Sequence, residues 1–322
     1  MLTQDSSVFA ETGQEELDQR EVARHLMLFH HLSQALGGAV PTEIVELDDV
    51  CTVLDVACGA GGWALDLACA YPHLQVTGID ASVRSIASAH RLAHEGGFSN
   101  VYFLVQDLCQ LQEEETPLPG VPFDLIHLSF IAPALLNMNY PTLVRALWRL
   151  CRLGGMLYWT EMEFPLTNSP TLELLIALIC EALNEAGHSF APQSTQALTE
   201  FFDARQHTAS SLSPCAIRRH LGITPMMGSW LHKAGYQYVQ QIPAVIEVSA
   251  GTEAHSCFTH QIESFTRQIS PFLIAQGVIT QDVFAQLCVQ IEAEVQQETF
   301  CGFCFLLSVL GQTPGPENAL PS

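Results

Sequence analysis

The sequence predicts an α/β fold with a mostly parallel β-sheet that helices cover on both faces. From residue 51 onward, short and nearly all-apolar segments alternate with segments of helical length. Strands this uniformly apolar are buried on both faces, as they are in parallel sheets whose strands are joined by helices. The chain of 322 residues, 48% of them hydrophobic, is long enough to bury a large core.

The individual elements follow from this alternation. A first helix is expected at 13–38, where apolar positions recur before Gly37-Gly38. Strands are predicted at 51–57, 75–80, 100–106, 123–130 and 155–163. The helices between them are predicted at 61–70, 83–95 and 139–152, and Gly154-Gly155 is expected to stop the last of these.

The alternation pauses between 166 and 222, a mainly helical segment with helices expected at 172–186 and 195–204. The later elements are a helix at 224–234, a strand at 236–248, helices at 256–275 and 281–298, and a last strand at 301–310. The tail at 313–322 is rich in Pro and Gly and is expected to be disordered.

The charge balance is strongly acidic, with 12 Lys and Arg against 34 Asp and Glu and a formal net charge of −22. Nucleic-acid binding rests on cationic contacts that displace counterions, so the sequence predicts no nucleic-acid partner. Anionic membranes are disfavoured by the same charge, and no apolar run reaches the roughly 18 residues that span a bilayer. Neutral or cationic small molecules stay open as partners.

The eleven cysteines lie mostly in apolar segments, where Cys behaves as a small hydrophobic residue. The first residues are polar and acidic and do not resemble a signal peptide. Reduced thiols and a cytoplasmic location are therefore expected. Cys301 and Cys304 have CxxC spacing, but residues three apart on a strand face opposite sides and no second pair completes a tetrahedral site, so no metal is predicted.

The segment from Val53 to Gly62 is the most informative motif. An apolar strand carrying Asp55 runs into a turn of small residues and leaves as a helix. Asp80 closes the next apolar strand, where a carboxylate can accept both ribose hydroxyl protons of a nucleotide cofactor. The glycines do not fit the dinucleotide pattern G-x-G-x-x-G, because position 64 is Ala, which counts against a nicotinamide enzyme.

Five motifs in order resemble those of the class I S-adenosylmethionine-dependent methyltransferases. They are Val53 to Gly61, Asp80, Gln106-Asp107-Leu108, the strand Phe123 to Ser129, and Leu153-Gly154-Gly155. Leu153 stands where the family usually has proline. The match is dense over 50–163 and loose over 224–310. The resemblance implies a Rossmann-like, seven-stranded, mostly parallel sheet with a reversed last strand, and S-adenosyl-L-methionine as the cofactor.

The resemblance also suggests a division of the chain. It runs from an N-terminal helical cap at 1–45 to a cofactor-binding core at 46–165, a helical lid or substrate insertion at 166–222, the rest of the core with two inserted helices at 223–312, and the tail at 313–322. Helical pieces in these places resemble the lids of small-molecule methyltransferases.

Cofactor-binding roles follow from the resemblance, residue by residue. The residues concerned are Asp55, Ala57, Gly59, Gly61, Asp80, Ala81, Gln106, Asp107, Leu108, Ser129 and, from the first helix, His30. Gly59 and Gly61 are expected under the methionine part, Asp80 at the ribose, and Asp107 at the adenine amino group. The alternatives are structural. Asp55 would be a purely structural acid, Asp107 a helix cap, and His30 an ordinary histidine.

The candidate catalytic bases are His127, Glu161 and Glu163, with His188 and His207 as further ones. His127 shares a strand face with Ser129, and the two glutamates share a face at the end of the fifth strand. That edge is the functional one in an open α/β sheet, where a carboxylate can deprotonate a nucleophile or stabilise a cationic acceptor. Polar strand-end residues in water are the alternative interpretation.

The expected function is methyl transfer from S-adenosylmethionine to a small, neutral or cationic molecule, with secondary metabolites among the candidates. The alternatives are a regulatory or scaffold protein that binds the cofactor without methyl transfer, and a non-methylating enzyme with the same cofactor. The sequence leaves the acceptor atom and the oligomeric state open, and a homodimer is compatible with it.

Overall fold

The structure is a computed structural model that describes residues 36–40, 47–108, 110–112, 118, 122–131, 139–187 and 221–315. It divides into two compact units. The sheet unit comprises 13–162, 225–246 and 306–322, and the helical unit comprises 1–12, 163–224 and 247–305. Most of the predicted cap at 1–45 and the predicted helix at 195–204 lie outside the described residues.

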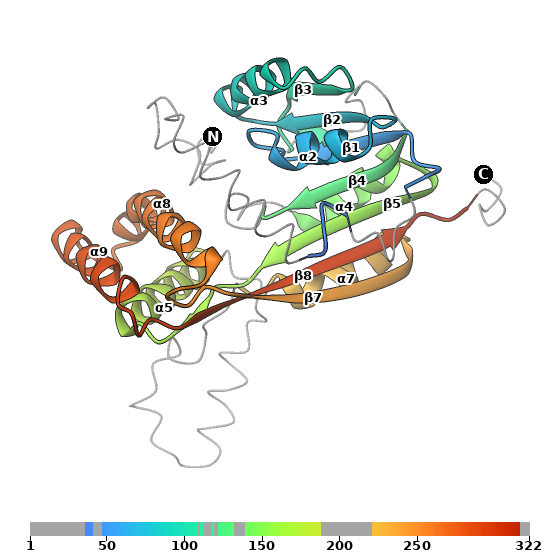
Figure 1. The fold of residues 1–322 in the computed structure, drawn as a ribbon. Coiled ribbons are helices and arrows are strands. Elements are labelled where there is room, and N and C mark those ends of the chain that lie inside the picture. Colours follow the sequence, from blue (N-terminus) through green and yellow to red (C-terminus); the bar gives the residue numbers. More distant parts are fainter. Residues whose placement is uncertain are drawn as a thin grey trace, which may run out of the picture. The chain divides into compact units, whose positions relative to one another are not determined.

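The sheet unit is built on five parallel strands in the order β3-β2-β1-β4-β5 (Figure 1). These are β1 (Thr52–Val56), β2 (Gln75–Asp80), β3 (Val101–Val105), β4 (Phe123–Ser129) and β5 (Cys151–Met162). β8 (Gly302–Gln312) runs antiparallel to β5 and also pairs with β7 (Gln237–Glu247). The predicted α/β fold, with its mostly parallel sheet and reversed last strand, is confirmed.

The sheet has eight strands where the family resemblance implied seven. The additional strand is β6 (Leu166–Thr167), which pairs with the first residues of β8 in the helical unit. Two residues are too few to show the alternating pattern by which a strand is recognised in a sequence.

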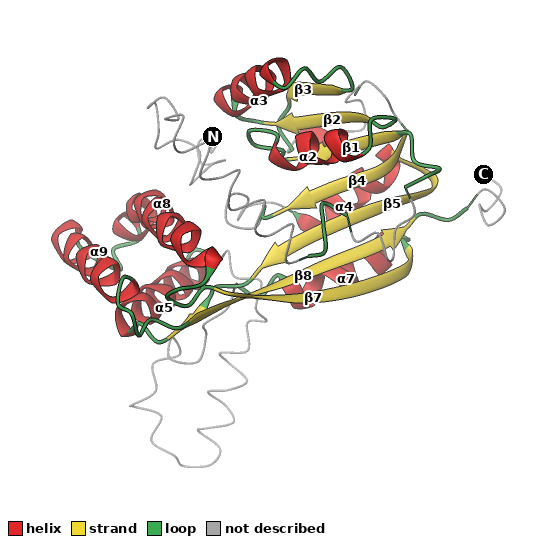
Figure 2. Ribbon diagram, viewed as in Figure 1, coloured by secondary structure: helices red, strands yellow, loops and turns green. Residues whose placement is uncertain are grey.

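Helices cover both faces of the sheet, with α2 (Gly62–Ala70) on one face and α4 (Tyr140–Leu150) and α7 (Thr224–Ala234) on the other (Figure 2). α3 (Val83–Glu95) packs on β3, and the 3-10 turn η1 (Gln110–Gln112) contacts α4. The core beneath α2 and α3 is contiguous and apolar. Its buried members include Val53, Trp63, Leu67, Val76, Phe103, Leu125 and Tyr158.

The helix stop predicted at Gly154-Gly155 is wrong. α4 ends at Leu150, and both glycines lie inside β5, where the pairing register with β4 shifts between Phe123 and Leu125. Gly154 has φ +77°, a left-handed conformation that favours glycine. The two glycines therefore form a bulge in the strand. The sequence does not reveal this bulge, because the glycines follow a helical run and so resemble a helix stop.

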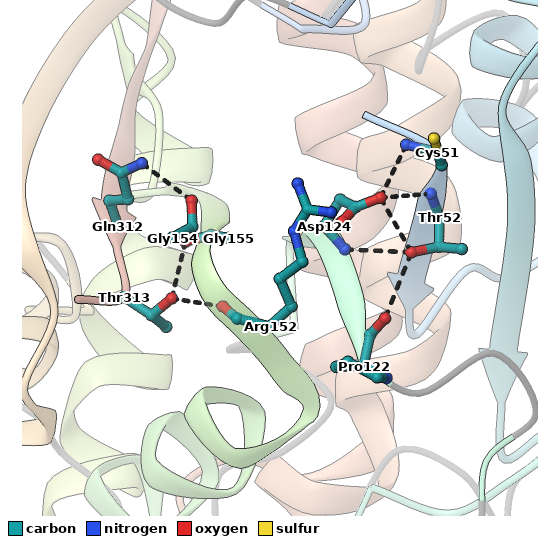
Figure 3. A network of polar contacts seen from close by, with 9 residues as sticks. All are labelled: Cys51, Thr52, Pro122, Asp124, Arg152, Gly154, Gly155, Gln312 and Thr313. Atoms are coloured by element: carbon teal, nitrogen blue, oxygen red, sulfur yellow. Dashed lines mark hydrogen bonds and ion pairs between the residues drawn. The ribbon is translucent and has the colours of Figure 1, made fainter. Parts of the chain in front are cut away.

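A polar network ties this bulge to neighbouring strands at their amino ends (Figure 3). One oxygen of Asp124 accepts from the backbone N–H groups of Cys51 and Thr52 at 2.7 and 2.8 Å. The other oxygen lies 2.8 Å from Nε of Arg152. Asp124 is 4% exposed, so these bonds compensate the burial of its charge.

Residues 313 and 314 hydrogen-bond to the bulge, whereas the sequence predicts a disordered tail at 313–322. The Thr313 hydroxyl donates to the Arg152 carbonyl at 2.6 Å (Figure 3). The Gly154 N–H donates to the Pro314 carbonyl at 2.9 Å. Residues 316–322 lie outside the described residues. The turn residues at 313–315 therefore close a specific contact with the bulge, although their composition predicts disorder.

The helical unit contains α5 (Pro170–Glu185), α8 (Glu253–Ala275) and α9 (Gln281–Val295), which pack on one another. Glu294 of α9 caps the start of α5. It accepts from the Ser169 hydroxyl at 2.6 Å and from both the N–H and the hydroxyl of Thr171 at 3.0 and 2.6 Å. A carboxylate at a helix amino end also complements the helix dipole.

Acid is expected to weaken the helical unit through Glu294. Partial burial would raise the pKa of this carboxyl, but the hydrogen bonds from Ser169, Thr171 and Gln290 outweigh it and lower the pKa from 4.5. A carboxyl whose pKa is lower in the folded than in the unfolded state stabilises the folded protein above about pH 4.5. This contribution is lost as the pH falls through the folded-state pKa. Urea unfolding of Glu294→Gln should therefore show less loss of stability between pH 6 and pH 3.5 than wild type. Glu298→Gln is the exposed control, and an equal loss in all three proteins would contradict the prediction.

The cysteines among the described residues all have free thiols. No group of three His, Cys, Asp or Glu side chains within the described ranges could hold a metal ion. None of the helices in the described part of the chain is long and apolar enough to cross a membrane.

Candidate cofactor site

The glycine loop, residues 57–62, follows β1 at the carboxyl edge of the sheet. The Cys58 N–H donates to the Ile79 carbonyl at 2.9 Å, and the Gly61 N–H donates to the Cys58 carbonyl at 2.9 Å. Ala57, Gly59 and Gly61 have φ of +57°, +54° and +83°. Every second residue from 57 to 61 is therefore left-handed, and Ala57 adopts a conformation that costs a non-glycine residue about 1 kcal/mol.

The two central glycines are required for different reasons. A Cβ at Gly61 would lie 2.6 Å from Cζ of Phe103, a buried side chain of β3. A Cβ at Gly59 would meet no heavy atom within 4 Å. Gly61 therefore closes the loop against the core, whereas Gly59 borders open space at the edge where a ligand of this fold would lie.

α2 begins directly after the loop without a side-chain cap, because its N-cap residue is Gly61. The amino end of a helix carries unpaired N–H groups and a partial positive charge, both of which favour an anionic group. The next helix, α3, differs, since the Ser82 side chain accepts from the Ser85 N–H at 3.2 Å. The uncapped end is thus available to the carboxylate of a ligand.

Asp80, at the end of β2, holds the loop in place. Its Oδ2 accepts from the Gly59 N–H at 2.9 Å, and its Oδ1 accepts from the Ser82 N–H at 2.8 Å. The side chain is half-buried, so the carboxylate remains within reach of solvent. One acid therefore joins the glycine loop to the start of α3 and can still accept from a ligand hydroxyl, because each oxygen has a further lone pair.

The residues after β3 continue the same edge. The Gln106 N–H donates to the Asp80 carbonyl at 2.9 Å, and its side-chain amide donates to Gln110 at 2.8 Å. Asp107 is half-buried, whereas Leu108 is 4% exposed and packs into the core. The Leu108 side chain therefore anchors this turn.

The structure thus brings most of the predicted cofactor residues to the carboxyl ends of β1 to β4. Ala81 is exposed beside Asp80, and Ser129 is half-buried at the end of β4, opposite Thr160 of β5. His30 lies outside the described residues, as do His188 and His207.

Asp55 and His127 form a buried pair just before the loop. They are direct neighbours in the β1–β4 register, and Asp55 Oδ1 lies 2.7 Å from His127 Nδ1. Each residue is 2% exposed. The His127 ring stacks on Trp63 with centroids 3.8 Å apart and planes at 9°. The structure therefore places His127 with Asp55 and Trp63 in the core rather than in open space.

Glu161 is fully buried, with 0% exposure. Its Oε1 accepts from the indole N–H of Trp159 at 2.9 Å and from the Ile131 N–H at 3.1 Å. Ile131 follows Phe130, which has φ +53°, a strained conformation for a bulky residue. Glu161 thus fixes the chain as it leaves β4.

Glu163 lies just beyond β5 and caps α7. Its Oε2 accepts from the Gly222 N–H at 2.9 Å, and its Oε1 accepts from the N–H and the hydroxyl of Thr224 at 3.1 and 2.8 Å. Both carboxylate oxygens are therefore engaged with the amino end of a helix. Glu161 and Glu163 therefore do not form one site, because Glu161 binds Trp159 and Ile131 whereas Glu163 binds the amino end of α7.

Sequence reasoning did not single out Trp63, Phe103 or Phe130. Trp63 stands inside the glycine motif, so an aromatic residue in the first turn of the following helix was a visible signal. Phe103 packs against Gly61 from a strand 42 positions later, and no local pattern connects the two. The positive φ of Phe130 has no sequence signal, because bulky residues rarely adopt it.

Comparison with known proteins finds similarity to methyltransferases in the segment that contains this edge of the sheet. A family model described as "Methyltransferase domain" matches residues 53–155. A 23S rRNA (uracil(747)-C(5))-methyltransferase of Yersinia pseudotuberculosis is 35% identical over 81 residues, which are 25% of this chain and 21% of that protein. The chain therefore spans about a fifth of the length of the curated relatives it matches.

Solved structures give a looser likeness. Phosphoethanolamine N-methyltransferase 2 of Haemonchus contortus, in complex with S-adenosylhomocysteine, has 15% identity and a TM-score of 0.48 over 92% of this chain and 60% of that one. The YcgJ protein of Bacillus subtilis has 19% identity and a TM-score of 0.42 over 87% and 98%. At these values nothing about function follows from the likeness.

The resemblance found in the five motifs is confirmed by the family match. The matched segment contains the glycine loop, Asp80, Asp107, β4 and the start of β5. S-adenosylmethionine is the cofactor of this family. Residues 53–155 thus match a methyltransferase-domain model, and the same segment carries the motifs that resemble the class I S-adenosylmethionine-dependent methyltransferases.

Proposed function

We propose that the chain transfers a methyl group from S-adenosylmethionine to a small, neutral or cationic molecule. The observation that carries the proposal is the geometry of the glycine loop inside the matched segment. Asp80 holds the Gly59 N–H while the other side of Gly59 borders open space. At Gly61, by contrast, the corresponding space is filled by Phe103 and Ala89.

The residues present fit the cofactor in four ways. The uncapped amino end of α2 suits a carboxylate, and Asp80 suits ribose hydroxyls. Asp55, which has a buried oxygen without a hydrogen-bond partner among the described residues, suits a cationic group. Asp107 and the Leu108 backbone would take the adenine ring. When bound, the cofactor supplies an activated methyl group on a sulfonium.

The protein's part in such a reaction is to position the acceptor and to exclude water, so a dedicated base is not required. His127 and Glu161 are buried, and both oxygens of Glu163 are bound to backbone or hydroxyl donors. We therefore assign these three residues to stabilising the local structure rather than to acting as a base that deprotonates the methyl acceptor. The helical segment at 166–222 stays our candidate for the acceptor lid.

The proposed acceptor class follows from charge. Curated relatives of part of the chain act on ribosomal RNA, as their name states. This chain has a formal net charge of −22, and each phosphate contact of an RNA needs a cation from the protein. A neutral or cationic small molecule meets no such repulsion.

Calorimetry with S-adenosylhomocysteine tests the site. Asp80→Asn keeps an acceptor oxygen for the loop but loses the charge, so affinity should fall about 10- to 100-fold, corresponding to one charge-assisted hydrogen bond. Asp282→Asn, on the exposed start of α9, is the control and should bind as wild type. Absence of binding to wild type, or equal binding by Asp80→Asn, would overturn the proposed site.

A turnover assay separates the acceptor classes. S-adenosylhomocysteine formation is followed with a panel of small amines and hydroxyl compounds, and in parallel with ribosomal RNA. The proposal expects product with members of the first set alone. Product with RNA alone would overturn the acceptor class, and binding without product in any arm would favour a regulatory cofactor-binding protein.

A further inference from the structure

Two segments of the sheet unit contain no acidic residue. Asp and Glu are absent from 139–160 and from 225–246, although the chain has 34 of them among its 322 residues. The first segment contains α4 and most of β5, and the second contains most of α7 and β7. The two segments together hold four of the chain's twelve Lys and Arg, which are Arg145, Arg149, Arg152 and Lys233. The cations of this acidic chain are therefore concentrated where its acids are missing.

α4 and α7 lie next to each other on one face of the sheet (Figure 2). The rings of Tyr140 and Trp230 stack with centroids 5.4 Å apart. Toward the end of α4, Trp148 Nε1 lies 3.7 Å from the position that a Cβ on Gly235 would take. The exposed residues of the two helices therefore form one surface. We call it the basic surface, after its exposed cations Arg145, Arg149 and Lys233.

The three cations of the basic surface have no acidic partner within the described part of the chain. Arg152 differs from them, because its Nε lies 2.8 Å from a carboxylate oxygen of Asp124. Arg149 and Lys233 stand in the last turns of their helices, where a cation complements the helix dipole. The dipole does not explain Arg145, which precedes Arg149 by four residues, a spacing at which like charges on a helix repel.

Exposed apolar side chains follow the carboxyl ends of both helices. Leu153, three residues after the end of α4, is 48% exposed, and Tyr238, four residues after the end of α7, is 73% exposed. Tyr238 also has φ +50°, a left-handed conformation that is rare for a bulky residue and that concentrates at functional sites. Tyrosine and arginine are enriched in protein–protein interfaces, so the composition of this region suits a protein partner.

We propose that the basic surface is the docking site of a partner protein that presents a short acidic segment. Arg145 and Arg149 are one turn of α4 apart, about 6 Å along the helix axis, which matches carboxylates four residues apart on a partner helix. Lys233 adds a third charge from α7. The inference goes beyond the proposed function and does not depend on it, because α4 leads into the amino end of β5 whereas the glycine loop lies at the carboxyl edge of the sheet.

Other occupants fit the basic surface less well. A second copy bound through the same surface in a two-fold dimer would bring like charges together. A nucleic acid or an anionic membrane is an extended polyanion and would also meet the rest of a chain with a formal net charge of −22. A single small anion would contact few of the cations, because they are distributed over two helices. A short acidic segment can face the cations alone.

The test uses a fluorescein-labelled helical peptide with glutamate at every fourth position and alanine between, and follows its binding by fluorescence anisotropy. Wild type is expected to bind the peptide at low ionic strength and to release it as salt screens the ion pairs. The double variant Arg145→Gln/Arg149→Gln should bind about tenfold more weakly, which corresponds to two exposed ion pairs. Arg84→Gln/Arg91→Gln, on α3 of the same unit, changes the net charge equally and should bind as wild type.

Three results would overturn the inference, namely no binding by wild type, equal binding by Arg145→Gln/Arg149→Gln, or equal binding of a peptide with glutamine in place of glutamate. Phosphatidylserine vesicles, a single-stranded oligonucleotide and inorganic phosphate are tested in parallel. If one of these bound in place of the peptide, the partner class would be wrong. Wild type and the double variant should bind S-adenosylhomocysteine equally. Failure of both to bind it would overturn the proposed function and leave the docking site standing.

Urea unfolding shows whether the fold itself needs Arg145. Replacing this residue by Gln removes its repulsion with Arg149 and one long hydrogen bond, of 3.4 Å, to the Thr142 hydroxyl. The unfolding midpoint of Arg145→Gln is therefore expected to be no lower than that of wild type. A clearly lower midpoint would identify Arg145 as a structural residue and overturn its assignment to a partner. The same measurement on the double variant verifies that it is folded when peptide binding is compared.

Discussion

Gly61→Ala is expected to destabilise the sheet unit by about 2–4 kcal/mol, because a left-handed residue and an overpacked contact are combined at one position. The new Cβ would lie 2.6 Å from Cζ and 2.8 Å from Cε1 of Phe103, and 3.2 Å from the Cβ of Ala89. The Phe103 ring is 2% exposed and cannot move into solvent. Urea unfolding followed by circular dichroism measures the loss.

Gly59→Ala is the matched control, since it makes the same substitution two residues earlier. It shares the positive φ but meets no atom within 4 Å, so it should cost only about 1 kcal/mol of stability. Its methyl group would occupy the space proposed for the ligand, so its affinity for S-adenosylhomocysteine should fall more than its stability does. A Gly59→Ala protein that binds as tightly as wild type would show that the open side of the loop is not the ligand's place.

Glu161→Ala is expected to cost about 2–5 kcal/mol, because it leaves the Trp159 indole N–H and the Ile131 N–H buried without their acceptor. It should also release the strained turn at Phe130, at the carboxyl edge beside Ser129. Thermal and urea unfolding measure the first effect. The second is measured as increased proteolytic cleavage after β4 under native conditions.

Glu161→Gln distinguishes a structural role of Glu161 from a role as a catalytic base. The amide oxygen can still accept both hydrogen bonds, so this variant should keep most of its stability and its methyl-transfer activity. A Gln variant as stable as wild type but inactive would instead identify Glu161 as a base. The complete burial of Glu161 leads us to expect activity.

Much of the sheet unit could be predicted from sequence because its signals are local. β2 at 75–80, α3 at 83–95 and α7 at 224–234 have the predicted bounds, since each apolar or helical run is closed by a clear capping or turn residue. The cofactor edge could be predicted for a related reason. In a parallel sheet, the residue after each strand falls at the same edge, so Gly59, Asp80 and Asp107 could be placed together without a structure.

What could not be predicted depends on contacts between distant parts of the chain. His127 and Asp55 are 72 positions apart, and only the β1–β4 register pairs them. Glu163 looked like a partner of Glu161, but Gly222 and Thr224 bind it from about 60 positions away. The bulge at Gly154-Gly155 was missed because two glycines after a helical run have the same composition as a helix stop.

Hydrogen exchange with mass spectrometry can locate the binding of S-adenosylmethionine to the glycine loop, Asp80 and the turn after β3. The measurement compares the protein with and without saturating S-adenosylhomocysteine. We expect slower exchange at residues 57–63, 80–82 and 106–108, with little change in α5, α8 and α9. Unchanged exchange at these three segments under conditions of measured binding would contradict this expectation.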